Sequence, residues 1–373
     1  MNSLIVIPLL YNEKTTDYQL QTALELIKNN TVVFYNINSQ LRLKSLFKKI
    51  KFLKDHVVNK QGIYYFSPLN LLPFIRFKLI NDINTAVDFF LISLFFYKKK
   101  RYLWSFNPHV ASLLSFGTKQ YTIIFDIVDY FPTNRINTQN QKKLIEKSDF
   151  VFVNSKTLLK LNKGTKKINL VPQGFRVDSF QQTNPKTSLD FPSKPIIGFV
   201  GGINSRLDYP LLYQLASRNP QYQFVLWGPR VIDHPNDELL DIPSQLLKLK
   251  KLKNISWGES SKKDIPYIIK KFDICIIPYN TNLEFNLYCY PMKLFEYFYL
   301  GKPIISSPIE ELKLSKFKDL VYIANNVVEW EQQIKKLLSQ PWPSDKKIKQ
   351  RKMALDNSWK RKVKAICDTV SYN

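Results

Sequence analysis

Two charged residues, Lys293 and Glu296, stand three positions apart in the stretch YPMKLFEYFYLGKPIISSP, which covers residues 290–308. The apolar residues around them follow a helical period, and residues three apart on a helix share one face. A cation and a carboxylate near a helix start can hold a phosphate group and a sugar hydroxyl. The alternative is a solvated ion pair without a function, which is common on exposed helix faces. These two residues alone leave both interpretations open.

Glycines and an arginine follow another apolar run, in the sequence GFVGGINSR. Gly198, Gly201 and Gly202 lie at the end of a predicted strand, and Arg206 is close behind. Backbone amides that a ligand can approach, together with a guanidinium group, would form a cradle for a pyrophosphate. Ordinary turn geometry also explains a glycine pair at this place.

Two aspartates, Asp126 and Asp129, lie where an earlier predicted strand ends, in FDIVDYFP. Ligands of open parallel sheets bind at the carboxyl ends of the strands, so a carboxylate there can act as a catalytic base. A helix cap or a turn former is the alternative for a strand-end aspartate.

The elements that must position these residues are short apolar strands alternating with amphipathic helices, the pattern of βαβ units and parallel sheets. Strands are predicted over residues 4–10, 31–35, 102–105, 121–125, 150–154, 168–171, 195–200, 223–227, 255–257, 274–277 and 304–305. Helices are predicted over residues 18–28, 108–116, 140–147, 158–161, 209–218, 265–271, the 290–300 stretch and 357–370. The polar stretch 181–195 contains three prolines and reads as a linker. We therefore predict an α/β protein with two doubly wound, Rossmann-like domains, over residues 1–180 and 196–356.

The composition limits the class of protein. The chain has 373 residues, of which 45% are hydrophobic, enough for two cores. Its three cysteines and three histidines lack metal-ligand spacing, which favours a reducing compartment and argues against a metal site. No secretory signal fits the start, and the apolar run 89–97 is too short to span a bilayer. The predicted location is the cytoplasm.

The formal net charge of +25 would attract anions such as nucleic acid, lipid headgroups or phosphorylated substrates. Lysines spread over a solvated surface are an equal alternative. The stretch 41–53 has the pattern of a basic amphipathic helix. With Phe74, Ile75, Phe77 and the run 89–97 before KKKR, it indicates either contact with an anionic membrane surface or ordinary core packing. Charge alone supports no nucleic-acid partner, because a recognition helix or RNA-binding signature is missing from the sequence.

Several motifs, in order and spacing, resemble the GT-B glycosyltransferases, in particular the family 4-like branch whose motif reads P-x-K-hydrophobic-x-E-Y. In the second half these are IGFVGGINSRLDYPLL, WGP, NISWGES, DICIIPY and YPMKLFEYFYLGKPIISSP. In the first half LWSFNPH, FDIVDYF, SDFVFVNS and VPQGFRVDSF resemble the acceptor domain. The resemblance covers nearly the whole chain, and it implies that the helix in 357–373 crosses back onto the first domain.

The resemblance implies that Glu296 accepts the ribose hydroxyls of a nucleotide and that Lys293 neutralises its diphosphate. It further implies that Gly201, Gly202 and Arg206 complete the phosphate site. Backbone near Gly258 and Glu259 would contact the nucleobase of the donor. Cations and amides placed in this way stabilise a departing diphosphate without a metal or other cofactor.

Other positions leave roles open. An inverting enzyme would need a base, which Asp129 would supply. His109, in NPH before a helix, would either touch the donor sugar or cap that helix. Many retaining relatives carry a second glutamate eight residues before the position of Glu296, where this chain has Tyr288. Glu284 is a possible substitute further upstream, and the stereochemical outcome stays open.

The predicted protein is a cytoplasmic, metal-independent glycosyltransferase of the hexosyltransferase type. It would transfer sugar from a nucleotide-diphosphate donor to a glycan or lipid-linked acceptor for cell-surface polysaccharide. Peripheral attachment to the inner face of the cell membrane is an alternative to a location free in the cytoplasm. The alternatives are a nucleotide-sugar epimerase of the same fold and a non-catalytic binding or scaffold protein.

Overall fold

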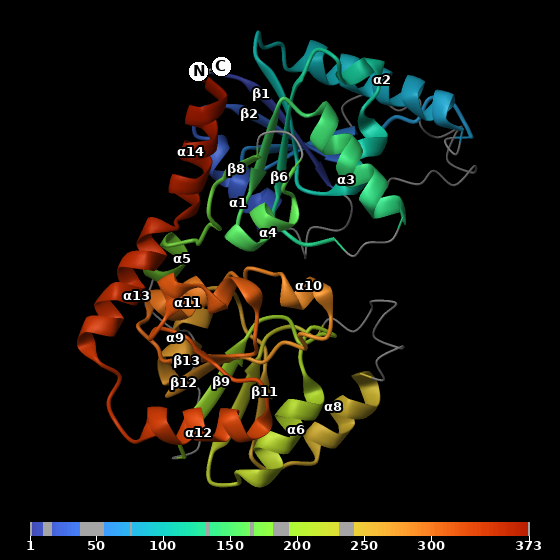
Figure 1. The fold of residues 1–373 in the computed structure, drawn as a ribbon. Helices are drawn as coiled ribbons and strands as arrows, with labels where there is room; N and C mark the ends of the chain where they lie inside the picture. The colour runs from blue at the N-terminus through green and yellow to red at the C-terminus, as the bar shows by residue number, and fades with distance from the viewer. Residues whose placement is uncertain are drawn as a thin grey trace. The chain divides into compact units, whose positions relative to one another are not determined.

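The structure, a computed structural model, describes residues 2–9, 17–37, 56–74, 77–131, 135–164, 168–181, 194–230 and 242–371. The chain forms two compact units, one of Met1–Pro172 with Lys362–Asn373 and one of Gln173–Arg361 (Figure 1). Each unit contains one sheet with helices against it. The predicted α/β class with two parallel sheets is confirmed.

The first unit has an eight-stranded sheet in the order β3-β4-β2-β1-β5-β6-β7-β8. All of its pairings are parallel except the β3–β4 hairpin at one edge. The strands are β1 (Leu4–Leu9), β2 (Thr31–Asn36), β3 (Val57–Lys60), β4 (Ile63–Phe66), β5 (Arg101–Ser105), β6 (Thr122–Ile127), β7 (Phe150–Val153) and β8 (Ile168–Leu170).

Helices cover both faces of this sheet, because alternate residues of each buried strand point to opposite sides. One core contains Leu4 and Val6 of β1 and residues of α2 (Lys78–Phe95), the 3₁₀ helix η3 (Pro108–Leu113), α3 (Arg135–Lys147) and α4 (Lys156–Leu161). The other contains Ile5 and Ile7, residues of α1 (Asp17–Leu26) and the C-terminal helix α14 (Trp359–Ser371).

The second unit has a six-stranded parallel sheet in the order β11-β10-β9-β12-β13-β14. Its strands are β9 (Ile196–Val200), β10 (Gln223–Trp227), β11 (Ile255–Gly258), β12 (Ile274–Ile277), β13 (Ile304–Ser306) and β14 (Tyr322–Ile323). Numbered within the unit, this is the order 3-2-1-4-5-6 of a Rossmann sheet.

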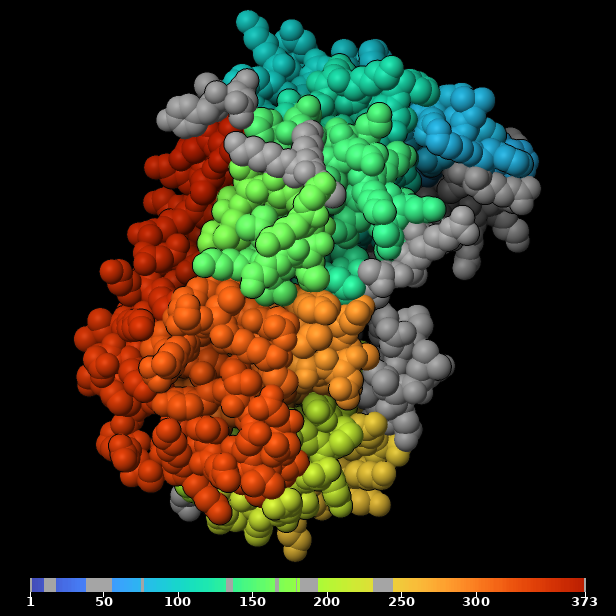
Figure 2. Space-filling view, in the orientation of Figure 1, coloured from blue at the N-terminus to red at the C-terminus, as the bar shows by residue number. Residues whose placement is uncertain are grey.

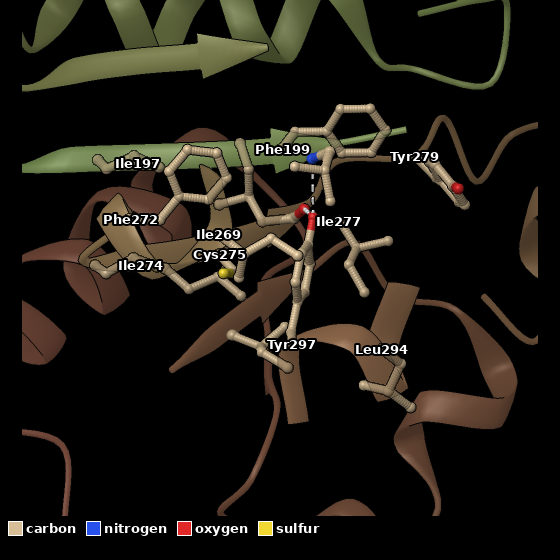
Figure 3. Close-up of a cluster of buried hydrophobic side chains, with 14 of the residues drawn as sticks. Ile197, Phe199, Ile269, Phe272, Ile274, Cys275, Ile277, Tyr279, Leu294 and Tyr297 are labelled. Carbon is tan, nitrogen blue, oxygen red and sulfur yellow. Dashed lines mark hydrogen bonds between the residues drawn. The ribbon is translucent and has the colours of Figure 1, made fainter. Parts of the chain in front are cut away.

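The helices of the second unit are α5 (Asp178–Gln181), α6 (Tyr209–Arg218), α8 (Ile242–Lys250), α9 (Ile265–Lys271), α10 (Glu284–Leu287), α11 (Lys293–Tyr299), α12 (Val327–Leu338) and α13 (Ser344–Asp356). The described part of the unit also contains two 3₁₀ helices, η5 (Glu310–Lys313) and η6 (Ser315–Phe317). Buried apolar side chains of β9, β10, β12 and β13 form its core, against which partly buried side chains of β11 and β14 pack. Figure 3 shows the part of this core around β9, β12 and α11.

Some predicted elements differ from those observed. The helix expected over residues 108–116 is two 3₁₀ helices, η3 and η4 (Phe116–Thr118). The first unit ends at Pro172 rather than at 180, and most of the expected linker and the basic stretch 41–53 lie outside the described residues. Within the described part of the chain, no helix is both long and apolar enough to cross a membrane.

Candidate functional site

The switch point of the second sheet lies between β9 and β12, because the chain leaves β9 toward β10 on one side and β12 pairs on the other. Ligands of doubly wound folds bind outside the carboxyl ends of the strands at this point. Gly201 directly follows β9, and Pro278 and Tyr279 directly follow β12. The geometry therefore places the predicted glycine turn at the position expected for a ligand.

The glycine turn is tightly packed against the neighbouring strand end. The Gly201 amide donates to the Trp227 carbonyl at 2.9 Å. Gly228 has φ of +148°, and a Cβ there would lie 2.1 Å from the Gly201 carbonyl oxygen. Gly201 itself has φ of +141°, and a Cβ on it would lie 3.0 Å from Cε of Lys293. Positions 201 and 228 therefore require glycine, and no side chain at either position covers the backbone of the turn from a ligand.

Lys293 reaches this turn from α11. Its ammonium lies 4.8 Å from the ring centroid of Phe199 and 4.6 Å from that of Tyr279, and it donates to the Tyr279 hydroxyl. The side chain is half-buried. Lys293 is therefore held between two aromatic rings beside Gly201, and the simple interpretation as a solvated surface charge does not describe it.

Tyr297 fixes the helix that carries this lysine. One turn after Lys293, its fully buried hydroxyl accepts from the Val200 amide at 3.1 Å and lies 3.4 Å from the Ile276 carbonyl (Figure 3). Burial raises the pKa of Tyr297 well above its usual value, so the hydroxyl stays neutral. This contact attaches α11 to the end of β9. Because residues four apart on a helix share a face, it also holds Lys293 on the side of α11 that faces β9.

Arg206 is held at the same place by a second set of contacts. Its guanidinium carbon lies 4.6 Å from the ring centroids of both Tyr279 and Phe285. Its Nε donates to Oδ1 of Asn286 at 3.0 Å. Asn286 is fully buried and donates through Nδ2 to the carbonyls of Arg206 and Asn280 at 3.1 and 2.9 Å.

Tyr279 consequently contacts both predicted cations. Arg206 and Lys293 come from different segments, yet each has its charge within 4.6 Å of the centroid of this one ring. Sequence reasoning missed Tyr279 and Asn286 as site residues. The available signal was the place of Tyr279 directly after β12 at the switch point, in the motif DICIIPY.

Glu296, Gly258 and Glu259 lie on neighbouring elements. Glu296 is half-buried in the first turn of α11. Gly258 ends β11 and its carbonyl accepts from the Gly228 amide at 2.8 Å, while Glu259 after it is exposed. All three stand on elements at the strand ends of the second unit, and their roles stay predictions.

The predicted catalytic residues of the first unit follow adjacent strands, because β5 and β6 pair in parallel. Asp129 follows β6 and is half-buried. His109 is exposed in η3, after β5. The cap of η3 is Asn107, whose Oδ1 accepts from the His109 amide at 2.9 Å. The imidazole of His109 is therefore not the cap that was considered for it.

Asp126 is not an open carboxylate, contrary to expectation. It is fully buried, and the ammonium of Lys362 lies 3.1 Å from its Oδ2 and donates to its Oδ1 at 3.2 Å. Burial raises the pKa of Asp126 although the lysine opposes the shift. The pair attaches α14 to β6, so Asp126 has a structural position and Asp129 remains the candidate base.

Two further positions concern the open stereochemistry. Tyr288 is the half-buried C-cap of α10, and Glu284 is exposed at the start of that helix. Across the described residues, no group of three or more His, Cys, Asp or Glu side chains is arranged to hold a metal ion.

No family model matches the chain. It is 25% identical over 228 residues to the Bacillus subtilis (strain 168) protein named "Putative teichuronic acid biosynthesis glycosyltransferase TuaH". The matched part is 58% of this chain and 55% of that protein, so the chain spans about half the length of this curated relative.

Solved structures are similar over nearly the full length. Sucrose-phosphate synthase from Thermosynechococcus elongatus matches with a TM-score of 0.71 and 13% identity, covering 100% of this chain and 99% of that one. HepE from Anabaena in complex with UDP matches at 0.69 and 12%, covering 100% of both chains. An α,α-trehalose-phosphate synthase (UDP-forming) from Burkholderia vietnamiensis matches at 0.72 and 10%, covering 100% and 99%.

These likenesses show that the chain has the GT-B fold, two Rossmann-like units in tandem. The resemblance to GT-B glycosyltransferases that the motifs predicted is confirmed.

Proposed function

We propose that the chain is a glycosyltransferase that takes sugar from a nucleoside-diphosphate sugar. The observation that carries this proposal is the pair of cations, Arg206 and Lys293, held on the ring of Tyr279 beside the Gly201 turn. Two fixed positive charges at the switch point of a Rossmann sheet suit a diphosphate. Support also comes from HepE, whose structures contain UDP and UDP-glucose, and from the name of the Bacillus subtilis relative.

The chemistry follows from the charge that develops as the glycosidic bond breaks. The diphosphate leaves with additional negative charge, and donors already in place stabilise it without reorganisation. In this proposal Lys293, Arg206 and the amides of Gly201 and Gly202 supply that stabilisation, so no metal is needed. Glu296 would accept the ribose hydroxyls, while backbone near Gly258 and Glu259 would meet the base.

The acceptor side of the proposal is a glycan or lipid-linked acceptor used in cell-surface polysaccharide synthesis. The name of the relative, which refers to teichuronic acid biosynthesis, supports this class of product. We place the chain in the cytoplasm at the inner face of the cell membrane. Its three cysteines are free thiols, as a reducing compartment favours.

Nucleotide binding by Lys293→Met tests the phosphate site. A hydrogen bond to a charged group contributes about 1.5–3 kcal/mol, so the dissociation constant for UDP should rise roughly 10- to 100-fold in isothermal titration. Lys270→Met is the matched control. It removes an exposed lysine at the end of α9, before β12 and hence at the opposite edge of the sheet, and should change affinity less than about twofold.

Unchanged affinity in Lys293→Met would remove the diphosphate role. If neither the unmodified chain nor any variant binds a nucleotide sugar, the chain is a non-catalytic protein with the same fold. Product formed from the nucleotide sugar without an acceptor would instead indicate an epimerase.

Asp129→Asn tests the inverting mechanism. If Asp129 takes the proton of the acceptor hydroxyl, transfer should fall by roughly 100- to 10,000-fold while UDP affinity stays unchanged. Turnover close to that of the unmodified protein would point to a retaining reaction or to another base.

A further inference from the structure

Helix α2 (Lys78–Phe95) buries a polar face and exposes an apolar one. Its buried residues are Asn84, Thr85, Asp88, Phe89, Ile92 and Ser93, four of which are polar. Its exposed large side chains are Leu79, Phe90, Leu94 and Phe95, at 68, 61, 64 and 52%. A surface helix of a globular protein normally has the opposite arrangement.

Hydrogen bonds fix this orientation of α2. Oδ1 of Asn84 accepts from the Leu72 amide at 2.8 Å, and its Nδ2 donates to the Leu72 carbonyl at 2.9 Å. The carboxylate of Asp88 accepts from the Tyr35 hydroxyl at 2.8 Å and from the Leu69 amide at 3.0 Å. Rotating the helix would leave these polar groups without partners, at a cost of about 1–3 kcal/mol each. These hydrogen bonds therefore keep the apolar face of α2 toward solvent.

Three exposed apolar side chains form a stripe along one side of α2. Leu79, Phe90 and Leu94 are separated by 11 and 4 positions, so they lie on one side of the helix. Phe74 and Phe77 before the helix and Tyr97 after it are exposed as well. Figure 2 shows the blue to cyan segment that contains α2 at the surface of its unit. Single exposed apolar residues are ordinary, but several large ones on one side of a helix indicate an interaction surface.

Positive charge accompanies the stripe. Lys98, Lys99 and Lys100 follow the helix, and Lys78 begins it. The carboxylate of Asp82 is 3.1 Å from the ammonium of Lys78, and the other acid of the helix is the buried Asp88. The three lysines thus add positive charge at the C-terminal end of the apolar stripe.

We propose that the α2 face, made of Leu79, Phe90, Leu94 and Lys98–Lys100, docks onto an anionic lipid surface. A helix lying in a membrane interface places apolar side chains at the acyl boundary and lysines among the headgroups. A second copy of this chain is the less suitable occupant, because in a twofold contact both copies would present the same positively charged face to each other. The proposal stands on α2 and does not depend on the glycosyltransferase activity.

The test is co-sedimentation of the full chain with vesicles of phosphatidylcholine mixed with phosphatidylglycerol, and with vesicles of phosphatidylcholine alone. The protein should bind the mixed vesicles and should dissociate as salt is added. Leu79→Ser/Phe90→Ser/Leu94→Ser should lower the partition coefficient at least about tenfold. Lys98→Gln/Lys99→Gln/Lys100→Gln should lower it roughly 100-fold and weaken the salt dependence.

A matched control replaces three similarly exposed apolar residues of the second unit. Leu247→Ser/Val328→Ser/Ile348→Ser, at 59, 52 and 70% exposure, should bind vesicles as the unmodified chain does. Both serine triples should keep the original melting temperature. Equal loss in both triples, or equal binding to the two vesicle types, would overturn the proposal. So would self-association in sedimentation equilibrium that the α2 triple abolishes, without binding of the unmodified chain to vesicles.

Discussion

Replacing Tyr279 with phenylalanine separates the two ways in which this residue acts on the candidate site. The substitution keeps the ring that lies 4.6 Å from the charges of Arg206 and Lys293. It removes the hydroxyl that accepts from the Lys293 ammonium. Tyr279 is 4% exposed, and phenylalanine keeps its buried ring, so the packing around β12 should stay unchanged. The variant therefore tests whether Lys293 needs to be held in place before a ligand arrives.

The magnitude follows from the freedom that Lys293 would regain. Ordering one long side chain on binding costs about 0.5–1.5 kcal/mol. The Tyr279 hydroxyl avoids this cost, because it already orders the Lys293 side chain before the ligand binds. Tyr279→Phe should therefore weaken UDP binding about 2- to 10-fold, since about 1.4 kcal/mol corresponds to a factor of ten. Lys293→Met, which removes the charge itself, should have the larger effect.

A double-mutant cycle by isothermal titration with UDP is the decisive assay. If the hydroxyl acts through Lys293, Tyr279→Phe should have no further effect once Lys293 is methionine. Additive losses would show that Tyr279 acts on the ligand directly or through Arg206. An unchanged affinity in the single variant would refute the positioning role of the hydroxyl.

Three further predictions concern stability and the glycine turn. Asp126→Asn should lower the free energy of unfolding in urea by about 3–5 kcal/mol, because Lys362 would be left buried without a countercharge, and adding Lys362→Met should recover most of it. Burial raises the pKa of Asp88 to about 6, so stability from its protonated form is full below about pH 4 and is lost as the pH rises through 6. Relative to Asp88→Asn, the unmodified chain should lose about 3 kcal/mol across that window in urea titrations at several pH values, and a constant difference would contradict this. Gly228→Ala should destabilise its unit by at least about 2 kcal/mol and abolish UDP binding, because the new Cβ meets a backbone oxygen at 2.1 Å. Gly164→Ala, with φ of +87° and no atom within 4 Å of the new Cβ, isolates the backbone strain from that clash.

Elements of the second unit could be predicted closely where the apolar pattern is local. Helices α6 and α9 and strands β10 and β12 begin and end at the predicted residues. Each is a buried strand or a helix with a plain amphipathic period. Such signals depend on neighbours in sequence, so no tertiary knowledge was needed.

Other elements could not be predicted, because tertiary contacts stabilise them. Helix α13, SDKKIKQRKMALD, is mostly exposed and lacks an apolar period. Its Gln350 is fully buried and donates to the carbonyls of Lys302 and Leu320 at 2.9 and 3.3 Å. The β3–β4 hairpin turns at Gln61 and Gly62, with φ of +54° and +84°, a pair less indicative of a turn than Asn-Gly.

Helix α2 was not among the helices predicted from the sequence, and a helical period alone does not give the direction of its faces. Periodicity identifies two faces, and the apolar one is assumed to be inward. In α2 four of the six buried residues are polar, and of these Asn84 and Asp88 bind the backbone of a preceding loop. Those partners are set by the packing of that loop, which a periodic pattern does not encode.

The contrast between Asp126 and Asp129 shows what strand alternation adds to a motif. Within β6, Ile124 belongs to the core shared with α14, as does Val128 just beyond the strand, so Asp126 between them must face the same helix. Helix α14 carries Lys362 beside buried Val363, and a buried ammonium requires a carboxylate. Once this shared core is known, the pairing of the two residues follows although 236 positions separate them. Asp129 follows the end of β6 and is half-buried, and it stays the predicted base.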